Sequence, residues 1–200
     1  MKYILASASP RRKELLTLAG LSFCACTPKL EEETLPGEGA EEAALRLACL
    51  KAAAVAEQNP EDCVISADTI VVAPDGGLLG KPFSAEDAAQ MLRRLSGREH
   101  RVVTGVCLRR GEIIRAFTQV TCVRFYPLTE LEIESYIHSG EPMDKAGAYG
   151  IQGRGALLVE EVHGDYFNVV GLPVARVIRE LSLLKAGDTP CPAPCVANSQ

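Results

Sequence analysis

The sequence lacks any apolar run long enough to cross a membrane, and it has only three histidines and no tryptophan. Its longer apolar stretches, such as Ala52–Ala56, fall far short of the roughly 20 residues that a transmembrane helix needs. The apolar start of the chain is also too short for a signal peptide and lacks a cleavage site. We therefore expect a cytoplasmic protein without membrane contact.

Histidine and cysteine patterns that would indicate a metal site or a nucleophile are weak. His100, His138 and His163 have no metal-ligand spacing, so we expect structural or surface roles for them. No Ser-His-Asp or Cys-His pattern stands out. The eight cysteines include no pair of C-x-x-C units. We expect reduced, mostly buried thiols, with a zinc site as the minor alternative.

An excess of basic residues is missing as well. Lys and Arg total 21 against 26 Asp and Glu, which gives a formal net charge of −5. Proteins that follow DNA or RNA usually carry a basic balance, so we expect no nucleic-acid polymer as partner. The basic residues gather at a few positions instead, and this distribution fits a small, highly charged anion.

The chain does contain enough apolar material for one sizeable core or two lobes, since 47% of its 200 residues are hydrophobic. The order of segments predicts an α/β protein with a mixed sheet, in which 1–185 form one domain and 186–200 a disordered tail. Expected strands are 2–6, 23–28, 63–73, 100–109, 112–125, 156–162 and 167–170, with 100–109 and 112–125 forming a hairpin. Helices are expected to begin at Pro10, Ala40, Ser84, Thr129 and Pro173.

The first candidate site is Ser7–Arg12, where a strand leads into a helix. Ser9 suits the N-cap and Pro10 the first helical position. Free N–H groups and the helix dipole attract anions there, whereas cations in the first turn oppose the dipole. Arg11 and Arg12 therefore make sense if an anion binds at the helix mouth. The alternative is a helix that merely begins with surface arginines.

The second candidate is Asp68, which interrupts the apolar segment 63–73. A carboxylate in such a segment is costly unless it is paired, hydrogen-bonded or bound to a metal. Asp68 therefore looks like a site residue. The alternative is a bulge or loop in which Asp68 caps local backbone.

Three weaker signals remain. Lys81 could act as a point charge on phosphate, or could simply be solvated; the Walker spacing is absent. The loop 140–153 has four glycines, which let backbone approach a ligand, and Gln152 could read a base edge; the alternative is a surface loop without function. The acidic run Glu31–Glu33 is either a solvated surface or a source of carboxylate for Mg²⁺.

Taken together and in order, these segments resemble the Maf family. The motifs that carry the resemblance are Ser7–Arg12, Ala67–Thr69, Gly80–Pro82, Ser96–Gly105, Glu141–Gly153 and Val169–Pro173. The resemblance covers 1–184, and the motif Asp144–Gly153 is its most specific part. It implies a Maf/inosine-triphosphate-pyrophosphatase-like fold, with a mixed curved sheet flanked by helices and two lobes around a central cleft.

The resemblance also implies an activity: a nucleoside triphosphate pyrophosphatase that releases a nucleoside monophosphate and pyrophosphate. It implies Asp68 as general base, and it links Arg11, Thr69 and Gln152 to a preference for dTTP and UTP. A divalent cation, Mg²⁺ or Mn²⁺, and a possible homodimer belong to the same expectation. The expected metal ligands are Asp68 and Glu32. The expected substrate contacts are Ser7, Arg11, Arg12, Lys51, Thr69, Lys81, Lys145 and Gln152.

Two alternatives stay open at this point. A sister group of the family prefers 7-methyl-GTP, so a pyrophosphatase for that or another non-standard purine nucleotide is one. A nucleotide-binding regulator of cell division without catalysis is the other. One small departure from the family pattern is Ser66, which stands where glycine is common before the Ala-Asp-Thr motif.

Overall fold

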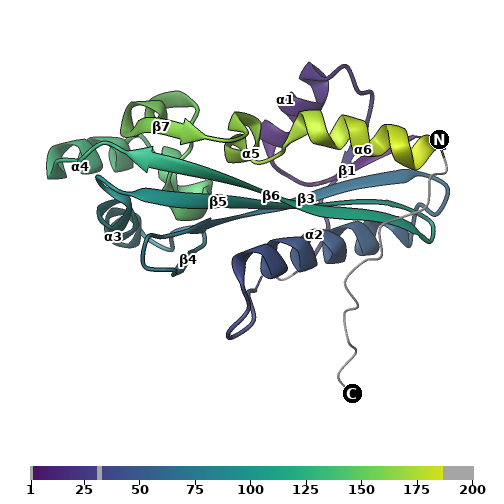
Figure 1. The fold of residues 1–200 in the computed structure, drawn as a ribbon, viewed down its shortest axis with the longest axis horizontal. Helices are drawn as coiled ribbons and strands as arrows, with labels where there is room; N and C mark the ends of the chain where they lie inside the picture. The colour runs from purple at the N-terminus through teal and green to yellow at the C-terminus, as the bar shows by residue number, and fades with distance from the viewer. Residues whose placement is uncertain (1, 31–32, 187–200) are drawn as a thin grey trace.

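The computed structural model describes residues 2–30 and 33–186, which form an elongated sheet with helices on both faces (Figure 1). The strands are β1 (Tyr3–Ala6), β2 (Cys24–Cys26), β3 (Cys63–Val72), β4 (Leu78–Leu79), β5 (Glu99–Arg110), β6 (Ile113–Phe125) and β7 (Val159–His163). The α-helices are α1 (Pro10–Leu18), α2 (Ala40–Ala56), α3 (Ala85–Leu95), α4 (Glu130–His138), α5 (Tyr166–Val170) and α6 (Val174–Ala186). Three 3₁₀ turns lie between α4 and β7: η1 (Glu141–Asp144), η2 (Ala146–Ala148) and η3 (Gly153–Leu158).

The sheet is mixed, as the sequence predicts. Its strand order is β2-β1-β3-β5-β6-β7, and β4 pairs with β3 outside this path. β1 runs parallel to both β2 and β3, whereas the pairs β3–β4, β3–β5, β5–β6 and β6–β7 are antiparallel. The predicted hairpin is β5–β6, and it extends along almost the whole molecule (Figure 1).

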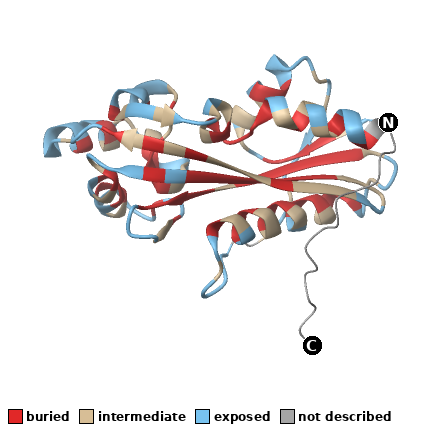
Figure 2. Ribbon diagram, viewed as in Figure 1, coloured by how far each residue is buried: buried red, intermediate tan, exposed pale blue. Residues whose placement is uncertain are grey.

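Two large apolar clusters lie at opposite ends of these long strands. One surrounds Leu16, Leu108 and Val177 beneath α1 and α6. The other surrounds Leu92 and Phe125 beneath α3 and α4. Helix α2 packs on the opposite face of the sheet from α1 and α6 (Figure 1), and buried residues run along the middle of the sheet (Figure 2). The architecture therefore has two lobes that share β3, β5 and β6.

Local chemistry explains most helix starts. The Ser9 hydroxyl accepts the Arg12 N–H, with Pro10 at the first helical position of α1. Thr129 and Glu132 form a full capping box for α4. At α3 the Ser84 hydroxyl accepts the Asp87 N–H, but the Asp87 carboxylate accepts the N–H of Phe83 instead of closing the box.

The predicted strand 167–170 is wrong, because this segment is helix α5. Asp165 caps it by accepting the N–H groups of Phe167 and Asn168. The side-chain amide of buried Asn168 then donates to the Val102 carbonyl and the Thr121 hydroxyl. These partners fix a helical turn that the apolar pattern alone could not distinguish from a strand.

Several other expectations can be compared with the described residues. β7 begins at Val159 rather than at 156, because 153–158 form η3. None of the described helices is long and apolar enough to cross a membrane. Six cysteines within the described ranges are free thiols, but only Cys63 and Cys107 of them are buried, so the expectation of mostly buried thiols is wrong for these six. No group of three or more His, Cys, Asp and Glu able to hold a metal occurs among the described residues. The predicted tail lies, apart from Ala186, outside the described residues.

Candidate active site

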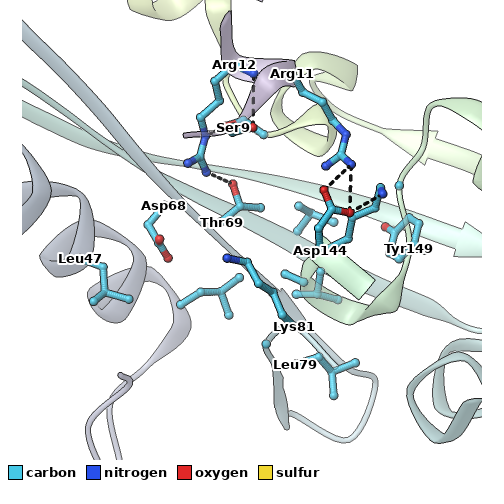
Figure 3. A pocket seen from close by; sticks show the side chains of 18 of the residues that line it. Ser9, Arg11, Arg12, Leu47, Asp68, Thr69, Leu79, Lys81, Asp144 and Tyr149 are labelled. Atoms are coloured by element: carbon cyan, nitrogen blue, oxygen red, sulfur yellow. Dashed lines mark hydrogen bonds and ion pairs between the residues drawn. The ribbon is translucent and has the colours of Figure 1, made fainter. Parts of the chain in front are cut away.

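One cavity of ≈1170 Å³ brings together the residues that the sequence singles out. Its walls come from both lobes, including the β1–α1 turn, α2, β3, the β4–α3 turn, the loop after α4 and the end of α5 (Figure 3). The predicted site residues that line it are Ser7, Arg11, Arg12, Lys51, Asp68, Thr69, Lys81, Lys145 and Gln152. Glu32, the other predicted metal ligand, lies outside the described residues.

Arg12 is held from several sides within this cavity. Its Nε donates to the Gly171 carbonyl at 2.8 Å. Its two terminal nitrogens donate to the hydroxyls of Ser7, at 3.3 Å, and Thr69, at 3.0 Å. These three hydrogen bonds fix the orientation of the guanidinium at the cavity wall.

A series of hydrogen bonds continues from Thr69 into the sheet. The Oγ1 atoms of Thr69 and Thr104 are 3.0 Å apart, and Thr104 Oγ1 lies 3.3 Å from the Asn168 carbonyl oxygen. Thr104 and Asn168 are buried. Sequence analysis assigned no role to Asn168, yet this residue connects the cavity wall to β5 and β6.

Asp68 lies in the middle of β3, and the strand is continuous through it. Its register partner on β5 is Gly105, so the bulge or loop alternative is contradicted. Lys51 on α2 donates to Asp68 Oδ1 at 2.5 Å, and both residues are buried. Oδ2 of Asp68 has no hydrogen-bond partner among the described residues. The pairing with Lys51 explains how a carboxylate is tolerated in this apolar strand.

The close approach of α2 to the sheet depends on two small residues. A Cβ at Gly105 would lie 2.2 Å from the Ala44 carbonyl oxygen, so only glycine fits there. The Ser66 hydroxyl lies 2.6 Å from the Ala48 carbonyl oxygen of α2. Ser66, the departure from the family pattern, therefore ties α2 to β3 beside Asp68.

Two of the predicted contacts have no protein partner within the described ranges. Lys81 follows Gly80 in the turn after β4, and its side chain points into the cavity (Figure 3). Gln152 precedes η3, and its side-chain amide makes no hydrogen bond to a described residue. Both side chains are therefore available to a ligand.

The loop after α4 contributes a further charge cluster. Asp144 accepts from Arg11 at 3.3 Å and from Lys145 at 2.6 Å (Figure 3). Partial burial tends to raise the pKa of Asp144, but Lys145 and Arg11 together hold it below its usual value. The Lys145 ammonium also donates to the Glu141 carbonyl. Asp144 lies inside a recognised motif, but nothing in the sequence indicated its partner on α1.

A neighbouring aromatic cluster is structural. His100 Nε2 lies 2.7 Å from the Tyr149 hydroxyl, and the His100 ring stacks edge-on with Tyr149 and Phe125. Burial lowers the pKa of His100 to about 4. The prediction of a structural role for His100 fits this environment.

The donor set can be compared with what Mg²⁺ or Mn²⁺ requires. Mg²⁺ usually keeps several waters and uses one or two carboxylates together with substrate phosphates. The cavity provides Asp68 with one uncommitted carboxylate oxygen, and Glu33 also lines it. These oxygen donors fit a cation that shares its coordination with a triphosphate.

Comparisons with known proteins identify relatives of this chain. A dTTP/UTP pyrophosphatase of Geobacillus sp. (strain WCH70) is 53% identical over 181 residues, covering 90% of this chain and 97% of the relative. One from Bacillus velezensis is 51% identical over 180 residues, covering 90% and 95%. A solved HAM1 protein from Coxiella burnetii shares the fold, with a TM-score of 0.54 at 14% identity over 91% of this chain and 98% of its own. The family model described as Maf-like protein matches residues 2–184, so the chain belongs to the Maf-like protein family.

Proposed function

We propose that this protein hydrolyses nucleoside triphosphates between the α- and β-phosphates, with dTTP and UTP as preferred substrates. The observation that carries the proposal is the convergence of five cations predicted to contact substrate and one buried carboxylate, Asp68, on a single cavity. The cations are Arg11, Arg12, Lys51, Lys81 and Lys145. The relatives' name, dTTP/UTP pyrophosphatase, supports the same reaction and the same bases.

In this mechanism Asp68 acts as general base. Its free oxygen, Oδ2, takes a proton from a water molecule while the water oxygen bonds to the α-phosphorus. The bond from the α-phosphorus to the bridging oxygen breaks, and pyrophosphate leaves with the bonding electron pair. Lys51 keeps the carboxylate oriented by holding Oδ1.

The cations around the cavity stabilise the charge that grows on pyrophosphate. Arg12 is already fixed by three partners, so its guanidinium does not reorganise when charge develops. A divalent cation held by Asp68, together with Glu32, would neutralise part of the triphosphate charge. Gln152 remains the candidate for a contact to the base.

The test is a panel of nucleoside triphosphates incubated with purified protein and Mg²⁺ or Mn²⁺, with pyrophosphate release as readout. We expect dTTP and UTP to be cleaved fastest, with the monophosphate as the other product. Faster cleavage of 7-methyl-GTP or of another purine nucleotide would instead assign the protein to the alternative substrate group. Binding of nucleotides without pyrophosphate release would support the non-catalytic regulator.

Location and assembly are part of the proposal. The free thiols among the described cysteines are typical of a reducing compartment such as the cytoplasm. Pairing into a homodimer stays a prediction, which sedimentation analysis of the purified protein would test.

A further inference from the structure

A single carboxylate, that of Asp144, contacts two cations of the cavity, Arg11 and Lys145. Asp144 Oδ1 lies 2.6 Å from the Lys145 ammonium and 3.4 Å from an Arg11 terminal nitrogen, while Oδ2 lies 3.3 Å from the same nitrogen. Arg11 comes from α1, and Asp144 and Lys145 come from the segment after α4, so the contact joins two distant parts of the cavity wall. Figure 3 shows Arg11 and Asp144 pointing toward each other. A phosphate group would bind there in the same way, with two of its oxygens facing an Arg and a Lys.

The ion pair between Arg11 and Asp144 is weak enough for a ligand to replace it. The Asp144 side chain is 62% exposed, whereas the Arg11 side chain is 23% exposed. Ion pairs with an exposed partner add little stability, because water solvates the charges almost as well. By contrast, the Lys51–Asp68 pair of the same cavity is buried on both sides. An incoming phosphate can therefore displace Asp144 far more easily than it can separate Lys51 from Asp68.

We propose that Asp144 is an internal competitor for the phosphate-binding cations Arg11 and Lys145, and that it returns to them when pyrophosphate leaves. The inference rests on the proposed function only in naming pyrophosphate as the ligand to be released. Without such a competitor, the cations of the cavity would hold a highly charged product tightly and slow its departure. Asp144 thus acts on product release and takes no part in the chemical step.

Lys145 has a backbone arrangement that keeps it in place for this exchange. A Cβ at Gly150 would lie 2.7 Å from the Lys145 Cε, so the glycine leaves the channel through which the side chain passes. The Gly147 N–H donates to the Gly80 carbonyl, which joins this loop to the turn that carries Lys81. Asp144 can therefore move away while Lys145 and Lys81 stay on the same wall.

The test measures the affinity for inorganic pyrophosphate by calorimetry, with the variants Asp144→Asn and Asp144→Ala. Both should bind pyrophosphate about 3- to 5-fold more tightly than the wild type, the range expected for removing an exposed competing ion pair. Glu130→Gln is the matched control, since Glu130 forms an exposed bidentate pair with Arg93 outside the cavity. It should leave the pyrophosphate affinity unchanged.

A second variant connects the effect to Arg11. In an Arg11→Ala background, Asp144→Ala should tighten pyrophosphate binding by a clearly smaller factor, because the competed cation is gone. Equal or weaker binding of pyrophosphate by both Asp144 variants, with melting temperatures like that of the wild type, would overturn the inference. These affinities do not depend on turnover. A wild-type protein without activity would therefore contradict the proposed function, but the measured pyrophosphate affinities would still test the role of Asp144.

Discussion

Lys51 of α2 and Asp68 of β3 form a buried ion pair with 2.5 Å between the ammonium nitrogen and Oδ1. The pair exists because α2 lies unusually close to the sheet at Gly105, the residue opposite Asp68 on β5. One oxygen of the carboxylate is held in place, and the other is left without a partner among the described residues. The arrangement therefore serves both the stability of the strand and the chemistry proposed for Asp68.

Replacement of Asp68 by Asn should abolish most of the turnover. The amide cannot accept a proton from water, so kcat for dTTP should fall by about 10²–10⁴-fold, the usual contribution of a general base. Pyrophosphate release at saturating metal and substrate measures this change. A variant that melts near the wild-type temperature yet hydrolyses dTTP at the wild-type rate would remove Asp68 from this role.

Replacement of Lys51 by Met tests the structural half of the pair. Removing one partner leaves a buried carboxylate without compensation, so the free energy of unfolding should fall by about 3–5 kcal/mol. The double variant Lys51→Met/Asp68→Asn should be more stable than the sum of the single losses predicts. Urea titration of all four proteins measures the coupling, and strictly additive losses would show that the two side chains do not interact.

Replacement of Gly105 by Ala should push α2 away from the sheet. The added methyl would meet the Ala44 carbonyl oxygen, and overpacking of this kind costs about 1–3 kcal/mol. Turnover should also fall, because Lys51 moves with α2. Gly80→Ala is the control for stability, since nothing lies within 4 Å of a Cβ there. Equal melting temperatures for the two variants would contradict the proposed packing constraint.

Replacement of Gln152 by Leu should change base preference more than catalysis. The side-chain amide is free to bond a base edge, whereas Leu offers no donor or acceptor. We expect the ratio of kcat/KM for dTTP to that for GTP to fall, with the fold unchanged. Comparison of both substrates in one assay series provides the measurement, and an unchanged ratio would assign base recognition to other residues.

Much of the fold follows from local sequence signals. The start of α1 follows from Ser9 and Pro10, and the β5–β6 hairpin follows from two long β-type segments around Gly111. Asp68 stood out because a carboxylate in an apolar strand needs a reason. In each case the interaction that decides the structure lies within a few residues or within one segment, so the local sequence pattern is enough to predict it.

The interaction partners of the site residues could not be predicted from local sequence patterns. Arg11 and Asp144 are 133 residues apart in sequence, and their contact depends on how α1 and the loop after α4 approach each other. The pairing of Lys51 with Asp68 depends in turn on the packing of α2. Helix α5 was missed because its apolar residues fit either element, and the interactions of Asn168 that decide it come from distant strands.

The buried His100 should make stability depend on pH in the acid range. Burial lowers its pKa from 6.5 to about 4 in the folded protein, so between these values the unfolded chain binds a proton that the folded protein does not. The free energy of unfolding should therefore decrease as pH falls from 6.5 to 4, by up to about 3 kcal/mol from this residue. Urea titrations across that range measure the slope. His100→Gln should flatten it whatever its own stability, whereas His163→Gln, at an exposed position, should keep the wild-type slope. An equal slope in all three proteins would contradict a neutral, buried imidazole at position 100.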